Sequence, residues 1–234
     1  VFKDIPGTLP GSRVLCNFFG GKRQRMTLGF PTHLTKLELS DAFRVHYMAN
    51  LKKIPPKFVN DGPIFENKMT GDAIDVGVFP TPKWHEDDGG RYIGTGSFNV
   101  TRDPDEGWIN CGTYRVMIHD KQTVGFYISP GKHGRIMRDK YEARKEPMPV
   151  AIVVGCDPMS FLMASSEVPY GVCEYEVIGG IRGTAELERL VNEGSAGVAF
   201  SGGAGFTSAS TAAASAKLPA ASASHRAGCW SEGR

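Results

Sequence analysis

Residues 91–128 read RYIGTGSFNVTRDPDEGWINCGTYRVMIHDKQTVGFYI. Short runs of aromatic and β-branched residues alternate there with polar segments, which is the pattern of consecutive β-strands. The polar segments at 103–107 and 120–122 predict turns, because Asp, Pro and Gly favour turn conformations. The strand-like runs are 92–93, 97–100, 114–118 and 124–128. This stretch therefore predicts a β-meander.

Helices and further strands are expected on both sides of the meander. Apolar residues recur at i+4 spacing within 31–53, where Ser40 or Asp41 could cap the helix and Pro55-Pro56 stops it. The other expected helices are 133–145, a short one starting at Asp157-Pro158, and 184–193. The other expected strands are 74–79 and the Val-rich, buried 149–155. The chain is therefore of the α+β class, with a mixed β-layer and peripheral helices.

The composition is that of an ordinary globular protein. Of 234 residues, 41% are hydrophobic and 22% are charged, which excludes a wholly disordered chain, a collagen and a coiled coil. The formal net charge is only +2, so electrostatics give no argument for nucleic acid or an anionic membrane. No apolar run approaches the roughly 18–20 residues that a membrane span requires. We therefore expect neither nucleic acid nor a membrane as a partner.

The ends of the chain and its cysteines indicate its context. The sequence begins Val1-Phe2 without a Met or a signal-peptide layout, so it reads as a chain that starts in mid-stream. Five scattered cysteines form no C-x-x-C pair, which predicts reduced thiols and a cytoplasmic location. From Ser195 to Gly228, 24 of 34 residues are Ala, Ser or Gly, and periodicity disappears. We expect this C-terminal tail to be unstructured.

Several polar residues stand out by their positions between predicted elements. Asn110 opens a strand after a turn, His133 lies in a tight loop before a helix, and Glu174 follows the turn 169–173. An amide oxygen, an imidazole and a carboxylate suit Mn²⁺ or Mg²⁺ beside a phosphate. On spacing alone the signal is weak, since a lone histidine in a Gly-rich loop is more often a residue that only completes its turn than a metal ligand. Arg115, within an apolar strand, either points outward or presents its guanidinium to a carboxylate or phosphate.

Longer motifs occur in a fixed order along residues 1–183. They are 88–93 (DGGRYI), 101–104 (TRDP), 110–115 (NCGTYR), 130–134 (PGKHG), 148–151 (MPVA), 156–158 (CDP), 168–176 (VPYGVCEYE) and 179–183 (GGIRG). In order and spacing these motifs closely resemble those of the UbiD family of decarboxylases. Several long motifs in register are a specific signal, which no single one of them would be.

The resemblance implies both a fold and a chemistry. UbiD enzymes are carboxy-lyases that use prenylated FMN, with Mn²⁺ and K⁺ at its phosphate, for the reversible, non-oxidative decarboxylation of aromatic and α,β-unsaturated acids. The flavin supplies the electron sink that no side chain provides. The expected domain is a UbiD-like cofactor-binding region over 1–183, with an N-terminal α/β part at about 1–85 and a split-barrel-like flavin-binding part at about 86–183. Residues 184–234 form the tail beyond it.

The resemblance also implies a role for each matching residue. By motif, the Mn²⁺ ligands are Asn110, His133 and Glu174. Glu176 is the competing carboxylate, because the register can slip by one or two residues there. Arg115 matches the catalytic arginine of the family's Glu–Arg–Glu network, which orients the substrate carboxylate and handles the proton. The residues expected to hold the cofactor are Thr95 and Trp108 near the phosphate and K⁺, Lys132 where relatives have another polar residue against the flavin, and the backbone of Asn110, Cys111, Gly112, Thr113, Tyr114 and Arg115, together with the metal ligands His133 and Glu174.

The family further implies partners and a metabolic setting. They are a small carboxylic-acid substrate, a flavin prenyltransferase that supplies the cofactor and, for full-length members, a homo-oligomer. The setting is aromatic-acid metabolism. Which acid is the substrate stays open, because the pocket walls that choose it lie partly in the half of the family's chain that is absent here.

After Gly183 the sequence departs from the family. The later motif that resembles Glu-Gly-Pro-Phe-Gly-Glu and carries the catalytic carboxylates is absent, as are a later cofactor-contacting lysine and the helical domain used in assembly. The tail is interpreted either as a natural flexible segment or as the product of a frameshift in a GC-rich gene. The alternative function is therefore a truncated, catalytically incompetent remnant that binds flavin and metal. A third reading is an FMN-binding β-domain with incidental metal-like residues.

Overall fold

The computed structural model describes residues 1–48, 52–56, 66–94, 96–182 and 213–214. Its strands are β1 Phe2–Lys3, β2 Arg13–Val14, β3 Lys68–Met69, β4 Ser97–Arg102, β5 Ile109–Gly112, β6 Arg115–Ile118, β7 Val124–Tyr127, β8 Val150–Val154 and β9 Ala213–Ala214. Its α-helices are α1 Lys22–Thr27, α2 Lys36–Phe43, α3 His133–Ala143, α4 Pro158–Ala164 and α5 Glu174–Arg182. The mixture of helices and strands confirms the expected combination of the two. The described strands do not close into a barrel.

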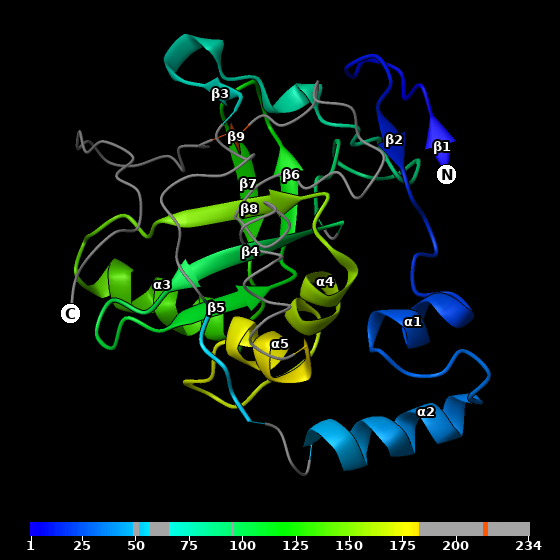
Figure 1. The fold of residues 1–234 in the computed structure, drawn as a ribbon. Helices are drawn as coiled ribbons and strands as arrows, with labels where there is room; N and C mark the ends of the chain where they lie inside the picture. Colours follow the sequence, from blue (N-terminus) through cyan, green and yellow to red (C-terminus); the bar gives the residue numbers. More distant parts are fainter. Residues whose placement is uncertain (49–51, 57–65, 95, 183–212, 215–234) are drawn as a thin grey trace.

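The central sheet has three antiparallel strands in the order β5-β4-β8. Asn99 of β4 pairs with Gly112 on one side and with Ile152 on the other. Strands β6 and β7 form a separate hairpin (Figure 1). The smaller pairs are β1 with β2, antiparallel, and β3 with β9, parallel.

The predicted meander is therefore only partly correct. The runs 97–100, 114–118 and 124–128 correspond to β4, β6 and β7, but β5 was not among the predicted runs and Tyr92 forms only an isolated bridge to Met117. The strands also divide between two sheets after Gly112. The backbone N–H of Thr113 donates to the carbonyl of Ala164 at the end of α4, 3.1 Å away, instead of to a strand. The Asn99 amide donates to the carbonyls of Gly112 and Tyr114 at 3.1 and 3.4 Å. These bonds satisfy the backbone at the break, so the chain can turn away from the sheet.

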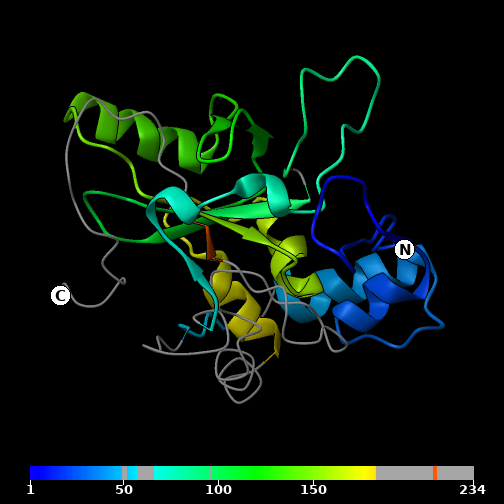
Figure 2. The same ribbon diagram turned by 90° about the horizontal axis from the view of Figure 1, so that it is seen from above.

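Alternate residues of β4 serve two different layers. Phe98 and Val100 face a core formed with α4 and α5. Ser97, Asn99 and Thr101 point to the opposite face, and each is 0% exposed. That opposite side is covered by α3, as Figure 2 shows with α3 above the sheet and α4 and α5 below it. Strand β4 is thus buried on both sides, with one apolar and one polar face.

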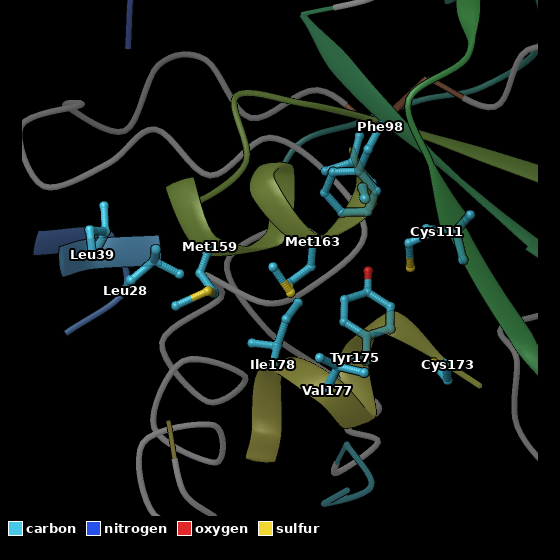
Figure 3. Packing of buried hydrophobic residues seen from close by; sticks show 13 residues of the cluster. Leu28, Leu39, Phe98, Cys111, Met159, Met163, Cys173, Tyr175, Val177 and Ile178 are labelled. Atoms are coloured by element: carbon cyan, nitrogen blue, oxygen red, sulfur yellow. The ribbon is translucent and has the colours of Figure 1, made fainter. Parts of the chain in front are cut away.

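The core below the sheet joins several elements (Figure 3). Met159 and Met163 of α4 and Ile178 of α5 are each at most 3% exposed, and Leu28 and Leu39 extend the cluster toward the N-terminal helices. The cluster also contains the buried thiols Cys111 and Cys173. Burial raises the pKa of Cys173 to about 12, which keeps this thiol protonated and unreactive.

The N-terminal half differs most from the sequence expectations. The helix predicted over 31–53 begins only at Lys36, because Thr35 and Glu38 form a capping box there, and α2 ends at Phe43 before a π-helical turn. The strand predicted at 74–79 is wrong, since it is replaced by 3₁₀ turns that Asp75 stabilises by accepting a bond from the Gly77 N–H at 2.8 Å.

The predictions for the second half are closer to the structure. The helix near 133–145, the strand near 149–155 and the helix from Pro158 are confirmed. The expectation missed α5, because Gly179 and Gly180 weaken its helical signal. The helix predicted at 184–193 and nearly all of the tail lie outside the described residues. None of the described helices is both long enough and apolar enough to cross a membrane.

A buried carboxylate holds the β4–β5 turn against α3. The Asp103 side chain is completely buried and accepts bonds from the N–H groups of Asp105 and Glu106 at 2.8 and 2.9 Å. Its second oxygen accepts from the Lys140 ammonium of α3 at 2.6 Å. The Asp103 N–H donates to the carbonyl of Trp108 at 2.9 Å. The turn therefore fixes the start of β5, where the candidate site begins.

Candidate functional site

A cavity of about 550 Å³ opens where β5 passes into β6. The loop before α3, the segment after α4 and the start of α5 form its other walls. The cavity brings together nine of the residues singled out from the sequence, which are Asn110, Cys111, Gly112, Thr113, Tyr114, Arg115, Lys132, His133 and Glu174. Trp108 does not line the cavity but contacts His133. Thr95 lies outside the described residues.

Glu174 is the most deeply buried acid of the cavity. It begins α5, is 2% exposed, and its Oε2 accepts a bond from the Cys111 N–H at 2.7 Å. Burial raises the pKa of Glu174 to about 7, against the opposing effect of the Cys111 hydrogen bond. Glu176, the competing carboxylate, is less buried and does not line the cavity. Of the two acids, only Glu174 can therefore present its carboxylate to a ligand in this cavity.

The Asn110 side chain is held by two hydroxyl groups. Asn110 is 2% exposed, and its Nδ2 donates to Thr101 Oγ1 and to Tyr114 Oη, each at 3.0 Å. Both amide hydrogens are thereby used. The Oδ1 oxygen remains as the atom of this side chain that can accept a bond or bind a cation.

His133 is the first residue of α3 and packs within aromatic rings. Its ring makes edge contacts with Trp108 at a centroid distance of 5.5 Å and with Tyr170 at 5.6 Å. Burial, followed by the positive charge of Lys132, lowers the pKa of His133. The imidazole is therefore held in its neutral form near pH 7, which is the form that binds metals.

Two cationic residues, Arg115 and Lys132, line the cavity, and their side chains make different interactions. Arg115 is exposed and lies opposite Tyr127 in the β6–β7 hairpin. No side-chain hydrogen bond or ion pair joins Arg115 to another described residue. Lys132 forms an ion pair with Glu167 at 2.6 Å across the rim. The exposure of Arg115 thus agrees with an outward-pointing side chain, and Arg115 is among the residues that line the same cavity as Asn110 and Glu174.

Comparison with known proteins decides the family. The model of the family described as UbiD, 3-octaprenyl-4-hydroxybenzoate carboxy-lyase Rift-related domain, matches residues 57–194, more than half of the chain. The chain belongs to the UbiD family. Over 191 residues it is 31% identical to pyrrole-2-carboxylic acid decarboxylase from Pseudomonas aeruginosa, covering 78% of this chain and 38% of that relative.

Solved structures of similar fold are also UbiD-type enzymes. Vanillic acid decarboxylase from Sedimentibacter hydroxybenzoicus, in its closed form, matches with a TM-score of 0.65 and 28% identity, over 71% of this chain and 36% of that one. An evolved dimeric form of the UbiD-class enzyme HmfF from Pelotomaculum thermopropionicum, in complex with prFMN, matches with a TM-score of 0.60 and 22% identity, over 70% and 37%. This UbiD-family chain therefore spans little more than a third of the length of these relatives.

Sequence reasoning missed several residues of the cavity in this UbiD-family chain. Tyr127 and the segment 164–168 line it. Tyr127 lies in a strand whose pattern predicts only packing, and residues 164–167 carry no motif, although Val168 opens the motif 168–176. Tyr170 contacts both His133 and Trp108. The signal for Tyr170 was available, because it stands in the VPYGVCEYE motif.

The donor atoms fit a hard divalent cation in this UbiD-family site. Within the described part of the chain, no group of three or more His, Cys, Asp or Glu side chains is placed to hold a metal. The candidate set has only two such residues and an amide, so a phosphate or water would complete its shell. Two features fit a ligand-binding role: burial raises the pKa of the Glu174 carboxyl, and the buried Nε1 of Trp108, which contacts His133, has no hydrogen-bond partner among the described residues.

The buried Glu174 predicts a pH dependence of stability in the metal-free UbiD-family protein. Folding raises the pKa of Glu174 from 4.5 to about 7, so the folded chain must ionise a buried acid as the pH rises through this range. The buried carboxyl of Glu174 therefore leaves the free energy of unfolding unchanged below pH 4.5, and it lowers that free energy by the full amount above pH 7. We expect Glu174→Gln to raise the free energy of unfolding at pH 8 by about 1–2 kcal/mol, with no gain at pH 4.5.

Urea unfolding with a chelator at several pH values measures this effect. Glu176→Gln, on the same turn of α5 but outside the cavity, is the matched control. An equal gain for Glu174→Gln at pH 4.5 and pH 8 would contradict the assigned cause.

Proposed function

We propose that this chain forms the cofactor-phosphate half of a UbiD-type decarboxylase site. The reaction is the non-oxidative, reversible removal of CO₂ from an aromatic or α,β-unsaturated carboxylic acid. The observation that carries the proposal is the arrangement of Asn110, His133 and Glu174 around one cavity, with Glu174 buried and raised in pKa. Support comes from the relatives, which are named as decarboxylases of pyrrole-2-carboxylic and vanillic acid.

In this proposal the protein binds prenylated FMN through its phosphate. Mn²⁺ would be held by the Asn110 oxygen, the neutral His133 imidazole and the Glu174 carboxylate, which suit a hard cation. A nearby K⁺, Thr95 and Trp108 would complete the phosphate region, where Trp108 contacts the proposed ligand His133. When bound, the modified flavin supplies the electron sink for the charge that CO₂ leaves behind. HmfF, which shares the fold, is in complex with prFMN.

The remaining residues bind and orient the substrate. Arg115, which is exposed and lines the cavity, would hold the carboxylate of the acid in a bidentate contact. The backbone from Asn110 to Arg115 would lie along the cofactor, and Lys132 would approach it from the rim. A proton must return to carbon after CO₂ departs, and Arg115 alone is a poor acid for that step. The family motif with the catalytic carboxylates is absent from this sequence.

The finer parts of the proposal rest on the family. They are a split-barrel-like flavin-binding part within a UbiD-like region over 1–183, a tail over 184–234, homo-oligomeric assembly, and a flavin prenyltransferase as the source of cofactor. Support for assembly comes from HmfF, which shares the fold and of which an evolved form is dimeric. A cytoplasmic location is part of the proposal, and it is supported by cysteines that are scattered in the sequence and unpaired where the structure describes them.

A binding role without turnover is the second candidate function. It is supported by the cavity itself, whose described lining gathers the proposed cofactor and metal ligands with only Glu167 and Glu174 as acids. Such a chain would retain flavin and metal through Asn110, His133 and Glu174 but would lack the groups that return the proton.

One experiment separates these functions. The chain is co-expressed with a flavin prenyltransferase, and the purified protein is analysed for modified-flavin absorbance, bound manganese and CO₂ release from cinnamic, vanillic and pyrrole-2-carboxylic acids. Release of CO₂ supports the decarboxylase. Flavin and manganese without CO₂ support the binding role and refute catalysis by this chain. Absence of both refutes the proposed site.

His133→Ala should lower the affinity for Mn²⁺ at least about tenfold, since loss of a ligand costs no less than loss of a group that supports one. Calorimetric titration of Mn²⁺ into the flavin-free protein measures this. His85→Ala, in an exposed loop outside the cavity, is the control and should leave the affinity unchanged. Equal affinities for the two variants would remove His133 from the ligand set.

A further inference from the structure

The hydroxyl of Tyr114 lies at the junction of two candidate ligand segments. Tyr114 is 8% exposed, and its Oη accepts one bond from Asn110 Nδ2 and one from the Gly134 N–H, both at 3.0 Å. Asn110 therefore lies on one side of this oxygen, and the start of α3, which carries His133, lies on the other. We propose that the Tyr114 hydroxyl is a positioning group that sets Asn110 and His133 relative to each other.

Helix α3 depends on this hydroxyl because it has no cap of its own. Lys132 occupies the N-cap position, and its side chain makes no capping hydrogen bond. The first N–H groups of a helix need acceptors from outside the helix. For Gly134 the acceptor is Tyr114 Oη, which lies 20 residues earlier in the chain. The start of the helix that carries His133 is therefore tied to the β5–β6 junction.

The orientation of the Asn110 amide follows from the same contacts. Thr101 Oγ1 donates to Met137 Sδ at 3.2 Å, so its oxygen accepts the Asn110 hydrogen. Tyr114 Oη accepts the second Asn110 hydrogen. With Nδ2 bound between two acceptors, the Asn110 oxygen is left to face a cation. Loss of one acceptor frees the amide to rotate.

The Tyr114 ring itself has little freedom. A Cβ atom at Gly134 would lie 2.7 Å from Tyr114 Cε2, and a Cβ atom at Gly112 would lie 2.5 Å from its Oη. The glycines thus leave room for the ring between two backbone segments. Phe126 of β7 contacts the ring edge-on at a centroid distance of 5.8 Å. The hydroxyl is therefore held in place by packing before any ligand arrives.

The inference rests on the proposed metal site, and Tyr114→Phe tests it. This change keeps the ring and removes only the shared acceptor. We expect the affinity for Mn²⁺ alone to fall about 10- to 100-fold, as is typical when a group that orients a metal ligand is lost. Tyr141→Phe, which removes a phenol from α3 outside the cavity, is the matched control and should bind like the wild type. Thr101→Val, which removes the other acceptor of Asn110, should weaken binding similarly.

Two measurements separate positioning from general destabilisation. Titration calorimetry is run well below the unfolding temperature of each variant, with circular dichroism to verify equal helix content. The paramagnetic resonance spectrum of bound Mn²⁺ should change in Tyr114→Phe and not in Tyr141→Phe. A wild type that binds no Mn²⁺ refutes the proposed site, and this role with it. A wild type that binds, with Tyr114→Phe within twofold of it and an unchanged spectrum, refutes only the role of Tyr114.

Discussion

Gly112→Ala should lower the free energy of unfolding by about 3 kcal/mol, which is the upper end for overpacking in a protein core. A Cβ atom there would lie 2.8 Å from Tyr114 Cε2 and 2.5 Å from its Oη. Neither the Gly112 backbone nor the Tyr114 ring can easily move to relieve this contact. Gly112 pairs with Asn99 in the central sheet, and the Tyr114 ring is packed against Phe126. Urea unfolding of the variant and the wild type measures the loss.

A double-mutant cycle identifies the cause of this loss. In a Tyr114→Ala background the ring is absent, so the added cost of Gly112→Ala should fall below about 1 kcal/mol. Gly89→Ala is the control, because its Cβ would meet only Met117 Sδ at an ordinary 3.7 Å. The explanation fails if Gly112→Ala costs as much without the Tyr114 ring as with it.

Asp103→Ala should cost about 3 kcal/mol of unfolding free energy. The change removes a fully buried carboxylate and leaves the N–H groups of Asp105 and Glu106 and the Lys140 ammonium without their acceptor. The hydrogen bond from Lys140 to Asp103 also raises the pKa of Lys140. Because Lys140 is partly exposed and can regain water, we place the loss at the low end of the range for broken buried pairs.

Asp105→Ala is the matched control for this network. Asp105 forms ion pairs with Lys140 and Arg144, and its side chain is 44% exposed. Exposed pairs contribute little, so we expect a loss below about 1 kcal/mol. Chemical unfolding of both variants in the same buffer makes the comparison. If Asp105→Ala costs as much as Asp103→Ala, burial of the carboxylate is not the reason for its importance.

Local sequence patterns predicted the second half of the fold better than the first. Residues 133–145 have a charged, helical pattern, 149–155 contain a continuous apolar run of strand length, and Asp157-Pro158 is a clear helix start, so local physics is sufficient there. In residues 31–53 the apolar spacing continued past the true helix, and the start depended on the Thr35–Glu38 capping box. Spacing predicts a face but not where a helix begins or ends.

The candidate site was predicted as a list of residues rather than as an arrangement. Motifs in register assigned the family and named Asn110, His133 and Glu174. Periodicity could not show that Glu174 starts a buried helix or that Cys111 donates to it. Contacts between residues more than 60 positions apart leave no local trace in a single sequence.

By itself the sequence determined the family and the identity of the groups, because the order and spacing of motifs are properties of the linear chain. Only the tertiary structure decided that Glu174, and not Glu176, faces the cavity, since helix α5 turns one acid inward and leaves the other outside. Only the tertiary structure gave Tyr114 its place between Asn110 and Gly134. The physical reason is burial: pKa shifts, shared hydroxyl groups and steric limits arise when distant segments exclude water together.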